Sequence, residues 1–173
     1  MITLPEFRFV CTPRTGSRTL ATALEPFGDR TRAHHNRIRD IPRDRPIYTV
    51  AREPLDQLES WYFHVFPPKG NWSSWSRWYP EGASFEDFLR FWTNDFLFPD
   101  LNPYRGIADK VFLFSDGMEN ILAQMGYPQS VGYTGGQRTL NHDWTAIELE
   151  IAEDRFAAEF EYYEKLNVQT KQG

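Results

Sequence analysis

Lysine and cysteine are scarce in this chain, and each shortage argues against a class of site. Among 173 residues only four are lysines, and no glycine directly precedes any of them. The Walker A motif needs a Gly-Lys pair followed by Ser or Thr, so an ordinary P-loop ATPase or kinase is not expected. The single cysteine, Cys11, has no partner for an internal disulfide. We expect it to pack in the core.

Long apolar runs and metal-ligand patterns are also missing. The sequence has no run of about 18 apolar residues and no charged-then-apolar leader, so we expect no membrane span, no signal peptide and a cytoplasmic location. His, Cys and carboxylate residues do not cluster with the spacing of metal ligands, so no metal is expected. The length suits a single domain over residues 1–173.

Charge is distributed unevenly along the chain. Residues 1–52 contain ten arginines and five acids, a balance of +5, whereas the remainder has nine basic and nineteen acidic residues, a balance of −10. Arginine enrichment at the N-terminal end favours a ligand that bears several phosphate or sulfate charges. Nucleic acid is the competing partner. We do not expect it, because the arginines fall at predicted strand ends and loops and the whole chain is acidic.

The first candidate site is a strand, turn and helix near the N-terminus. Residues 8–11 alternate polar and apolar side chains, which predicts a strand, and Pro13 and Gly16 end it. Apolar residues at helical spacing follow. Free backbone N–H groups and the helix dipole would form an anion cradle there, and Arg14 and Arg18 favour phosphate or sulfate as its ligand. The alternative is an ordinary turn with surface arginines.

A second segment repeats this order. Residues 47–51 read as a strand, and Pro54 suits the first turn of a helix. Arg52 ends the strand and Ser60 lies two turns into the helix. Both could reach a second anion at the carboxyl edge of an open α/β sheet, where ligands bind.

Together these segments resemble the PAPS-dependent sulfotransferases, where PAPS is 3′-phosphoadenosine 5′-phosphosulfate. Residues 13–20, Pro-Arg-Thr-Gly-Ser-Arg-Thr-Leu, are similar to the family's 5′-phosphosulfate loop, and Arg52 with Ser60 eight residues later matches its 3′-phosphate motif. The resemblance is continuous over residues 7–63. It implies a P-loop-like α/β fold with an open parallel sheet flanked by helices, PAPS as co-substrate and 3′-phosphoadenosine 5′-phosphate (PAP) as product. Arginine at position 14 is typical of carbohydrate and tyrosylprotein members.

The resemblance also implies residue roles. Arg14 would contact the transferring sulfonate and the leaving phosphate oxygen, and because a guanidinium is a poor proton donor we assign it charge stabilisation. Arg52 and Ser60 would hold the 3′-phosphate. The nucleotide would be bound around its 5′-phosphate by five further residues: Thr15, Gly16, Ser17, Arg18 and Thr19. Arg18 departs from the family pattern, in which Thr or Ser is common.

A hydroxyl acceptor must also lose its proton, and histidine is the usual base. His35, in His-x-x-Ile-Arg-Asp-Ile, resembles a histidine that ends the second strand of several carbohydrate sulfotransferases, and His34 is the alternative. A solvated basic turn would explain the same residues. His64, at the end of the Arg52 helix, is a candidate for lining the acceptor site.

The rest of the sequence predicts a loop that could bind the acceptor, together with further helices and a strand. A Trp-rich loop at about 64–82 is expected to form the acceptor pocket or, equally, to cover the core. A capping box at Ser84 predicts a helix, residues 111–114 a strand, and residues 144–166 one long helix. Arg138, in a Gly-Gly-containing loop, is a candidate second 3′-phosphate ligand or part of an ordinary surface turn.

The function predicted from the sequence is sulfonate transfer from PAPS to an acceptor hydroxyl by in-line displacement. The acceptor is expected to be a carbohydrate or another small molecule. Two alternatives stay open: a nucleotide-dependent phosphotransferase and a non-catalytic nucleotide-binding module.

Overall fold

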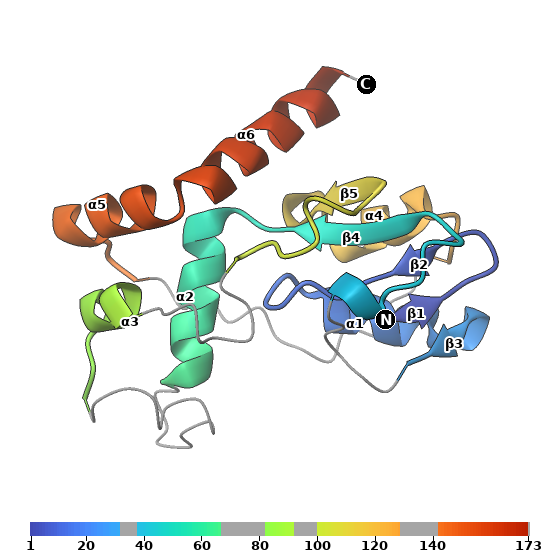
Figure 1. Ribbon diagram of the computed structural model, residues 1–173, viewed down its shortest axis with the longest axis horizontal. Coiled ribbons are helices and arrows are strands. Elements are labelled where there is room, and N and C mark those ends of the chain that lie inside the picture. Colours follow the sequence, from blue (N-terminus) through green and yellow to red (C-terminus); the bar gives the residue numbers. More distant parts are fainter. Residues whose placement is uncertain (32–37, 67–81, 92–99, 129–141, 173) are drawn as a thin grey trace.

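A computed structural model describes residues 1–31, 38–66, 82–91, 100–128 and 142–172 of the chain. Its centre is a five-stranded open sheet with the strand order β3-β1-β2-β4-β5 (Figure 1). The strands are β1 (Ile2–Thr3), β2 (Arg8–Phe9), β3 (Asp29–Arg30), β4 (Ile47–Ala51) and β5 (Lys110–Leu113). The sequence predicted β4 with these bounds.

The sheet is mostly parallel, as expected for this α/β class. β2, β4 and β5 pair in parallel, whereas β1 pairs antiparallel with both β2 and β3, so β1 alone runs against the other four. The expected open α/β sheet flanked by helices is therefore confirmed, with one antiparallel strand added. The cause is the short β1–β2 connection, residues 4–7, closed by a hydrogen bond from the Leu4 N–H to the Phe7 carbonyl at 2.9 Å. A parallel pair would need a crossover of about a dozen residues or more.

Six α-helices and three 3₁₀ turns lie in the described part of the chain. The α-helices are α1 (Ser17–Leu24), α2 (Pro54–Val65), α3 (Phe85–Phe91), α4 (Met118–Gln124), α5 (Ala146–Arg155) and α6 (Ala157–Gln172). The 3₁₀ turns are η1 (Glu25–Phe27), η2 (Ile38–Asp40) and η4 (Phe114–Asp116). α2 begins at Pro54 as predicted, and the carboxylate of Glu53 accepts the N–H of Asp56 at 2.7 Å.

The single helix predicted over residues 144–166 is wrong: the chain forms α5 and α6 with a break between them. Phe156 stands at the break with non-helical backbone angles (φ −115°, ψ 23°), and its side chain is buried among residues of α2 and α3. The ring is buried at this break, and burial of a phenylalanine is worth about 1.5–3 kcal/mol. The sequence periodicity does not report that tertiary contact.

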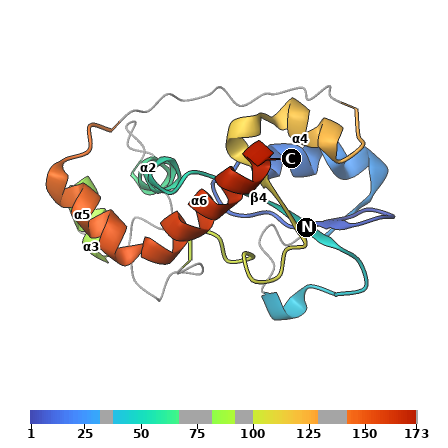
Figure 2. The ribbon, with the colours of Figure 1, turned by 90° about the horizontal axis from the view of Figure 1, so that it is seen from above.

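The two faces of the sheet carry separate apolar clusters, because successive strand residues point to opposite sides. Phe9, Val50 and Phe112 pack against α1 and α4 on one face. Val10 and Ile47 pack on the other, against segments outside the α-helices. A third cluster joins α2, α3 and α5 beyond the end of β4 (Figures 1 and 2).

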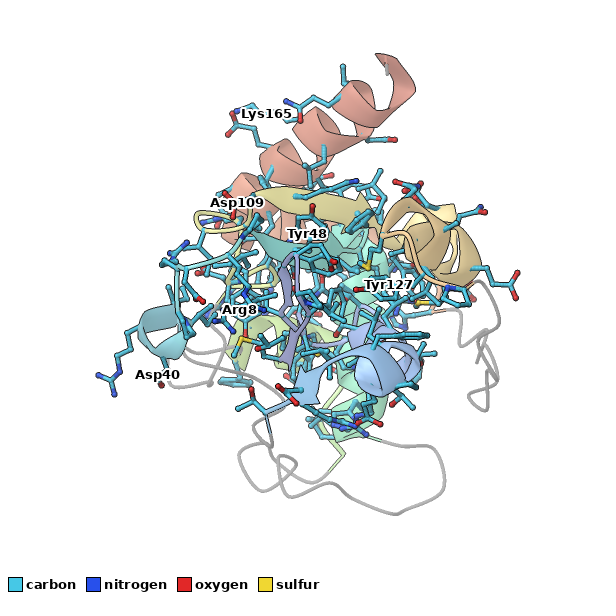
Figure 3. The ribbon with its side chains drawn as sticks, turned by 90° about the vertical axis from the view of Figure 1, so that its right-hand side faces the viewer. Arg8, Asp40, Tyr48, Asp109, Tyr127 and Lys165 are labelled. Carbon is cyan, nitrogen blue, oxygen red and sulfur yellow. The ribbon has the colours of Figure 1, made fainter. Side chains whose placement is uncertain are left out.

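Aromatic side chains of the sheet and of its β1–β2 connection pack against one another. Tyr48, in β4, stacks on Phe7 with ring centroids 4.1 Å apart and meets Phe112 edge-on at 5.8 Å. Figure 3 shows Tyr48 in the middle of the packed side chains, whereas Lys165 lies out on α6.

The carboxyl ends of the three parallel strands share one edge, so the loops after β2, β4 and β5 meet there.

Candidate functional site

Carbonyl oxygens of the segment that joins β2 to α1 accept hydrogen bonds from side chains. The hydroxyl of Thr49 donates to the Val10 carbonyl at 3.1 Å. The hydroxyls of Thr15 and Ser17 both donate to the Thr12 carbonyl, at 2.9 and 2.6 Å. These bonds fix the path of the loop and use two hydroxyls that the family resemblance had suggested for phosphate. Thr15 and Ser17 can still offer their backbone N–H groups to a ligand.

Two side chains from the segment after β4 also hold this loop in place through hydrogen bonds to its backbone. The buried Gln57, on α2, donates from Nε2 to the carbonyls of Pro13 and Leu101, at 2.8 Å each. Arg52 donates from Nη1 to the carbonyl of Arg14 at 3.1 Å. The loops after β2 and β4 are therefore joined directly, side chain to backbone.

The N–H groups of the loop are used differently from its carbonyls. Gly16 is the N-cap of α1, no side chain caps this end, and the first turn contains no acidic residue. Within the described ranges, the backbone N–H groups of Gly16, Ser17 and Arg18 donate to no other residue. The positive end of a helix with unsatisfied N–H groups is a ready site for an anion.

Backbone geometry at two positions is specific to this loop. Gly16 has φ 68°, and an added Cβ would lie 2.0 Å from Cε of Met118 and 2.8 Å from Cε2 of Phe114. Only glycine fits there without displacement of its neighbours. Arg14 has φ 62° and is the one non-glycine residue with positive φ among those described. Such a conformation costs on the order of 1–3 kcal/mol and tends to persist at functional sites.

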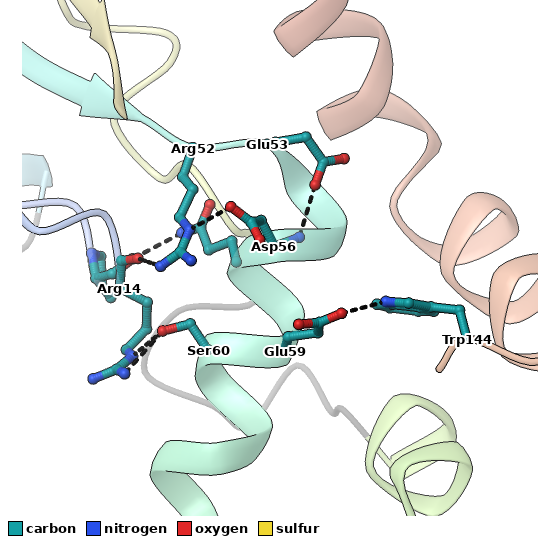
Figure 4. A network of polar contacts seen from close by, with 9 residues as sticks. Arg14, Arg52, Glu53, Asp56, Glu59, Ser60 and Trp144 are labelled. Atoms are coloured by element: carbon teal, nitrogen blue, oxygen red, sulfur yellow. Dashed lines mark hydrogen bonds and ion pairs between the residues drawn. The ribbon is translucent and has the colours of Figure 1, made fainter. Parts of the chain in front are cut away.

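Arg14 and Arg52 meet at the backbone of Arg14: the Arg52 guanidinium lies at the Arg14 carbonyl, and the Arg14 side chain extends to Ser60 (Figure 4). Arg14 donates to the hydroxyl oxygen of Ser60 from Nε and Nη2, at 3.1 and 2.8 Å. Arg52 donates from Nε to Oδ2 of Asp56 at 3.3 Å, and its Cζ lies 4.7 Å from the ring centroid of Phe114. All three parallel strand ends thus contribute to one cluster.

This cluster carries uncompensated positive charge. Burial lowers the pKa of Arg14 to about 10, with smaller contributions from the charges of Arg52 and Arg18, so it remains a cation at neutral pH. Asp56 pairs with Arg52, but no carboxylate of the described residues pairs with Arg14. The exposed Arg18 adds a third charge. Since removing a cation from water is costly without a counter-charge, the arrangement favours a bound anion.

Most other arginines of the basic N-terminal part serve the fold instead. Arg8 is buried and donates to Asp44 at 2.6 and 3.2 Å and to the hydroxyl of Thr3 at 2.7 Å. Arg30 pairs with Glu25, Arg43 donates to the Ile107 carbonyl, and Arg45 donates to the Leu4 carbonyl. The arginine count of residues 1–52 therefore overstates the charge available to a ligand.

α2 presents two further titratable groups near Ser60. His64 lies one turn beyond it, and burial together with the charges of Arg14 and Arg18 lowers the His64 pKa. Glu59 faces the other way and accepts the indole N–H of Trp144 at 2.6 Å (Figure 4). Burial is the main cause that raises the pKa of Glu59. His64 is thus on the arginine side of the helix, and Glu59 attaches the start of the C-terminal segment to the opposite side.

The structure brings together Arg14, Arg52 and Ser60, and it places residues 15–19 in the adjoining loop and first helical turn. His34, His35, Arg138 and residues 67–81 of the Trp-rich segment lie outside the described residues, and their roles stay predictions. Sequence reasoning missed Gln57. Its signal was a polar residue within the apolar stripe of α2 formed by Pro54, Leu58 and Trp61.

Neither another type of site nor a similar protein points to a function. Over the described ranges, no helix is long and apolar enough to cross a bilayer, and no group of three or more His, Cys, Asp or Glu side chains is placed to hold a metal ion. Comparison of the chain with protein-family models, with curated proteins and with solved structures gave no match. The geometry of the site alone therefore indicates a function.

Proposed function

We propose that this chain transfers a sulfonate group from PAPS to the hydroxyl of a carbohydrate or another small acceptor. One observation carries the proposal: the guanidinium of Arg14 contacts Ser60 and has no carboxylate partner among the described residues, while Arg52 binds the Arg14 carbonyl in the loop before α1, whose N-cap is a glycine. An adenosine with anionic groups on both the 5′ and the 3′ oxygens of its ribose would satisfy this charge. PAPS and PAP have that chemistry.

The two ends of the donor have separate partners in this proposal. The 5′-phosphosulfate binds the free N–H groups of Gly16, Ser17 and Arg18 together with the Arg14 guanidinium. The 3′-phosphate binds Arg52 and Ser60. The Ser60 oxygen accepts two N–H groups from Arg14, which leaves its own proton free to donate to a phosphate oxygen.

The proposed chemistry is in-line displacement at sulfur. The acceptor oxygen forms a bond to sulfur while the bond from sulfur to the phosphate oxygen breaks, and the electron pair stays on PAP. Negative charge therefore grows on the leaving oxygen. The permanently charged Arg14, held by Ser60 before the donor arrives, stabilises that charge without reorganisation.

Transfer of radiolabelled sulfonate tests this function directly. The protein is incubated with sulfur-labelled PAPS and separate panels of oligosaccharides, small alcohols and tyrosine peptides, and both labelled product and released PAP are measured. Label in a carbohydrate or alcohol, with stoichiometric PAP, is the expected result. Magnesium-dependent transfer from ATP with none from PAPS would instead establish a phosphotransferase. Tight PAP binding without transfer to any panel would favour a non-catalytic module.

A further inference from the structure

We propose that His64 accepts the proton of the acceptor hydroxyl, and that it becomes a stronger base when the donor is bound. This inference rests on the proposed function. It assigns the base to a residue of α2 instead of His34 or His35, and it couples proton acceptance to occupation of the anion site.

The position of His64 follows from helix geometry. It lies four residues after Ser60 on α2, and residues at this spacing share one helix face. Helical side chains lean toward the N-terminus of their helix, so the imidazole leans toward Ser60, whose Oγ is 2.8 Å from Nη2 of Arg14. The charge of Arg14 acts on His64, so the sulfonate that Arg14 would contact lies on the same side of α2 as this imidazole.

The packing of the His64 ring and its access to solvent are both those expected of a general base. Its ring packs edge-on against the buried Trp61, with centroids 5.9 Å apart and an interplanar angle of 64°. Burial against its neighbours lowers the His64 pKa, yet the residue keeps exposed surface through which an acceptor from solvent can approach. A rigid support on one side and an open approach on the other are what a positioned proton acceptor requires.

Burial and two nearby charges make His64 a weaker base than a free histidine. Burial is the main cause that lowers its pKa, and the charges of Arg14, from the loop after β2, and of Arg18, from α1, lower it further. No carboxylate of the described residues contributes to this shift. The imidazole is consequently neutral at pH 7, the state that a base needs. A sulfonate and phosphate bound to Arg14 would cancel the repulsion and raise the basicity of His64.

The proposed step is balanced within the donor, the acceptor and this side chain. The acceptor O–H bond breaks and its proton goes to an imidazole nitrogen of His64. The oxygen bonds to sulfur, and the bond from sulfur to the phosphate oxygen breaks. PAP leaves with that electron pair, and the imidazolium passes its proton to solvent. The negative charge on PAP stabilises the imidazolium until then.

His142 provides a matched control. Its Nε2 lies 2.9 Å from Oε2 of Glu148, and it precedes Trp144, which Glu59 binds on the side of α2 away from Ser60. Substituting His142 removes an imidazole from the same protein without touching the arginine cluster.

The first experiment follows imidazole proton signals by NMR across pH 5–8 (roughly 1.5 units on either side of the usual histidine pKa of about 6.5), with and without saturating PAP. The His64 signal is assigned by its absence in His64→Gln. We expect its midpoint below the usual value in the free protein and a clear rise with PAP, whereas addition of PAP should leave the chemical shifts of the His142 ring unchanged. If PAP saturates the protein and the His64 midpoint does not move, the inference is overturned and the proposed function survives. If PAP does not bind, both are overturned.

The second experiment measures turnover once an acceptor is sulfonated. His64→Gln should lower kcat by about 10²–10⁴-fold, keep the dissociation constant of PAP within about threefold, and remove the acidic limb of the pH–rate profile. His142→Gln should retain the wild-type profile. A full loss of activity in His34→Gln or His35→Gln, with wild-type kcat in His64→Gln, would overturn the assignment of His64. Unchanged circular dichroism shows that each variant is folded.

Discussion

Two N–H groups of Arg14 donate to the hydroxyl of Ser60, at 3.1 and 2.8 Å, and so connect segments 46 residues apart in the chain. The contact fixes a half-buried cation at the point where the loops after β2 and β4 meet. Together with the bond from Arg52 to the Arg14 carbonyl, it makes the two segments one site.

Removal of the Arg14 side chain should affect chemistry more than binding. We expect Arg14→Ala to reduce turnover by about 10²–10³-fold, the usual effect of losing a donor to developing charge, while much of the PAP affinity remains. Arg14→Lys keeps the positive charge but cannot donate two parallel hydrogen bonds as a guanidinium does, so its turnover should lie between those of the wild type and Arg14→Ala. Initial rates and calorimetry check this. Wild-type turnover in Arg14→Ala would contradict the role.

Arg52→Ala should chiefly weaken nucleotide binding. It removes the tether to the Arg14 carbonyl and, in the proposed function, a charged contact to the 3′-phosphate, and a hydrogen bond to a charged group contributes about 1.5–3 kcal/mol. We therefore expect the dissociation constant of PAP to rise by about 10- to 100-fold. Arg90→Ala is the control, because Arg90 is exposed and its side chain pairs with Glu86 on α3. Equal affinity in the two variants would exclude Arg52 from the binding site.

A methyl group at position 16 should destabilise the fold through a clash. Gly16 and Gly126 both have positive φ, 68° and 84°, but an added Cβ meets Met118 and Phe114 at position 16 and open space at position 126. Both alanine variants share the backbone strain, so their difference reports the clash. We expect Gly16→Ala to lose about 1–3 kcal/mol more than Gly126→Ala in urea unfolding.

A second substitution separates the clash from other causes. Adding Met118→Ala to Gly16→Ala removes the nearest atom, the Met118 Cε at 2.0 Å, and the double variant should lose less than the sum of the two single losses. If the loss of unfolding free energy in the double variant equals the sum of the two single losses, crowding by Met118 is not the cause of the destabilisation.

Gln57 should be needed for the shape of the loop. Gln57→Ala leaves the carbonyls of Pro13 and Leu101 without their donor, at a cost of about 1–3 kcal/mol each for a buried acceptor. We expect a lower midpoint in urea and a higher dissociation constant for PAP. Gln124→Ala, at an exposed position on α4, should change either quantity little. Unfolding midpoints that agree between the two variants would argue against the tether.

The sequence predicted the parts of the fold that have strong local signals. β4 and the start of α2 follow from an apolar run, then Arg52, Glu53 and Pro54, and the structure has the expected bounds. β1 and β3 contain two residues each and exist through pairing of Ile2 with Phe9 and with Arg30. No local pattern reports such pairing.

For the candidate site, too, the sequence predicts some features and not others. The meeting of Arg14 and Arg52 follows from parallel strands that share an edge, and the sequence indicated it. The inward donation of the Thr15 and Ser17 hydroxyls depends on the folded path of the loop. The use of Arg8 in an ion pair with Asp44 likewise depends on contacts 36 residues apart, which an arginine count does not separate from ligand binding.

Calorimetric titration of the wild-type protein with PAP and with ATP tests the central claim most directly. The account predicts that PAP binds at least about tenfold more tightly than ATP, a difference of about 1.4 kcal/mol, and that Arg14→Ala combined with Arg52→Ala abolishes this preference. Equal affinity for the two nucleotides, or a preference for PAP that survives loss of both arginines, would contradict it.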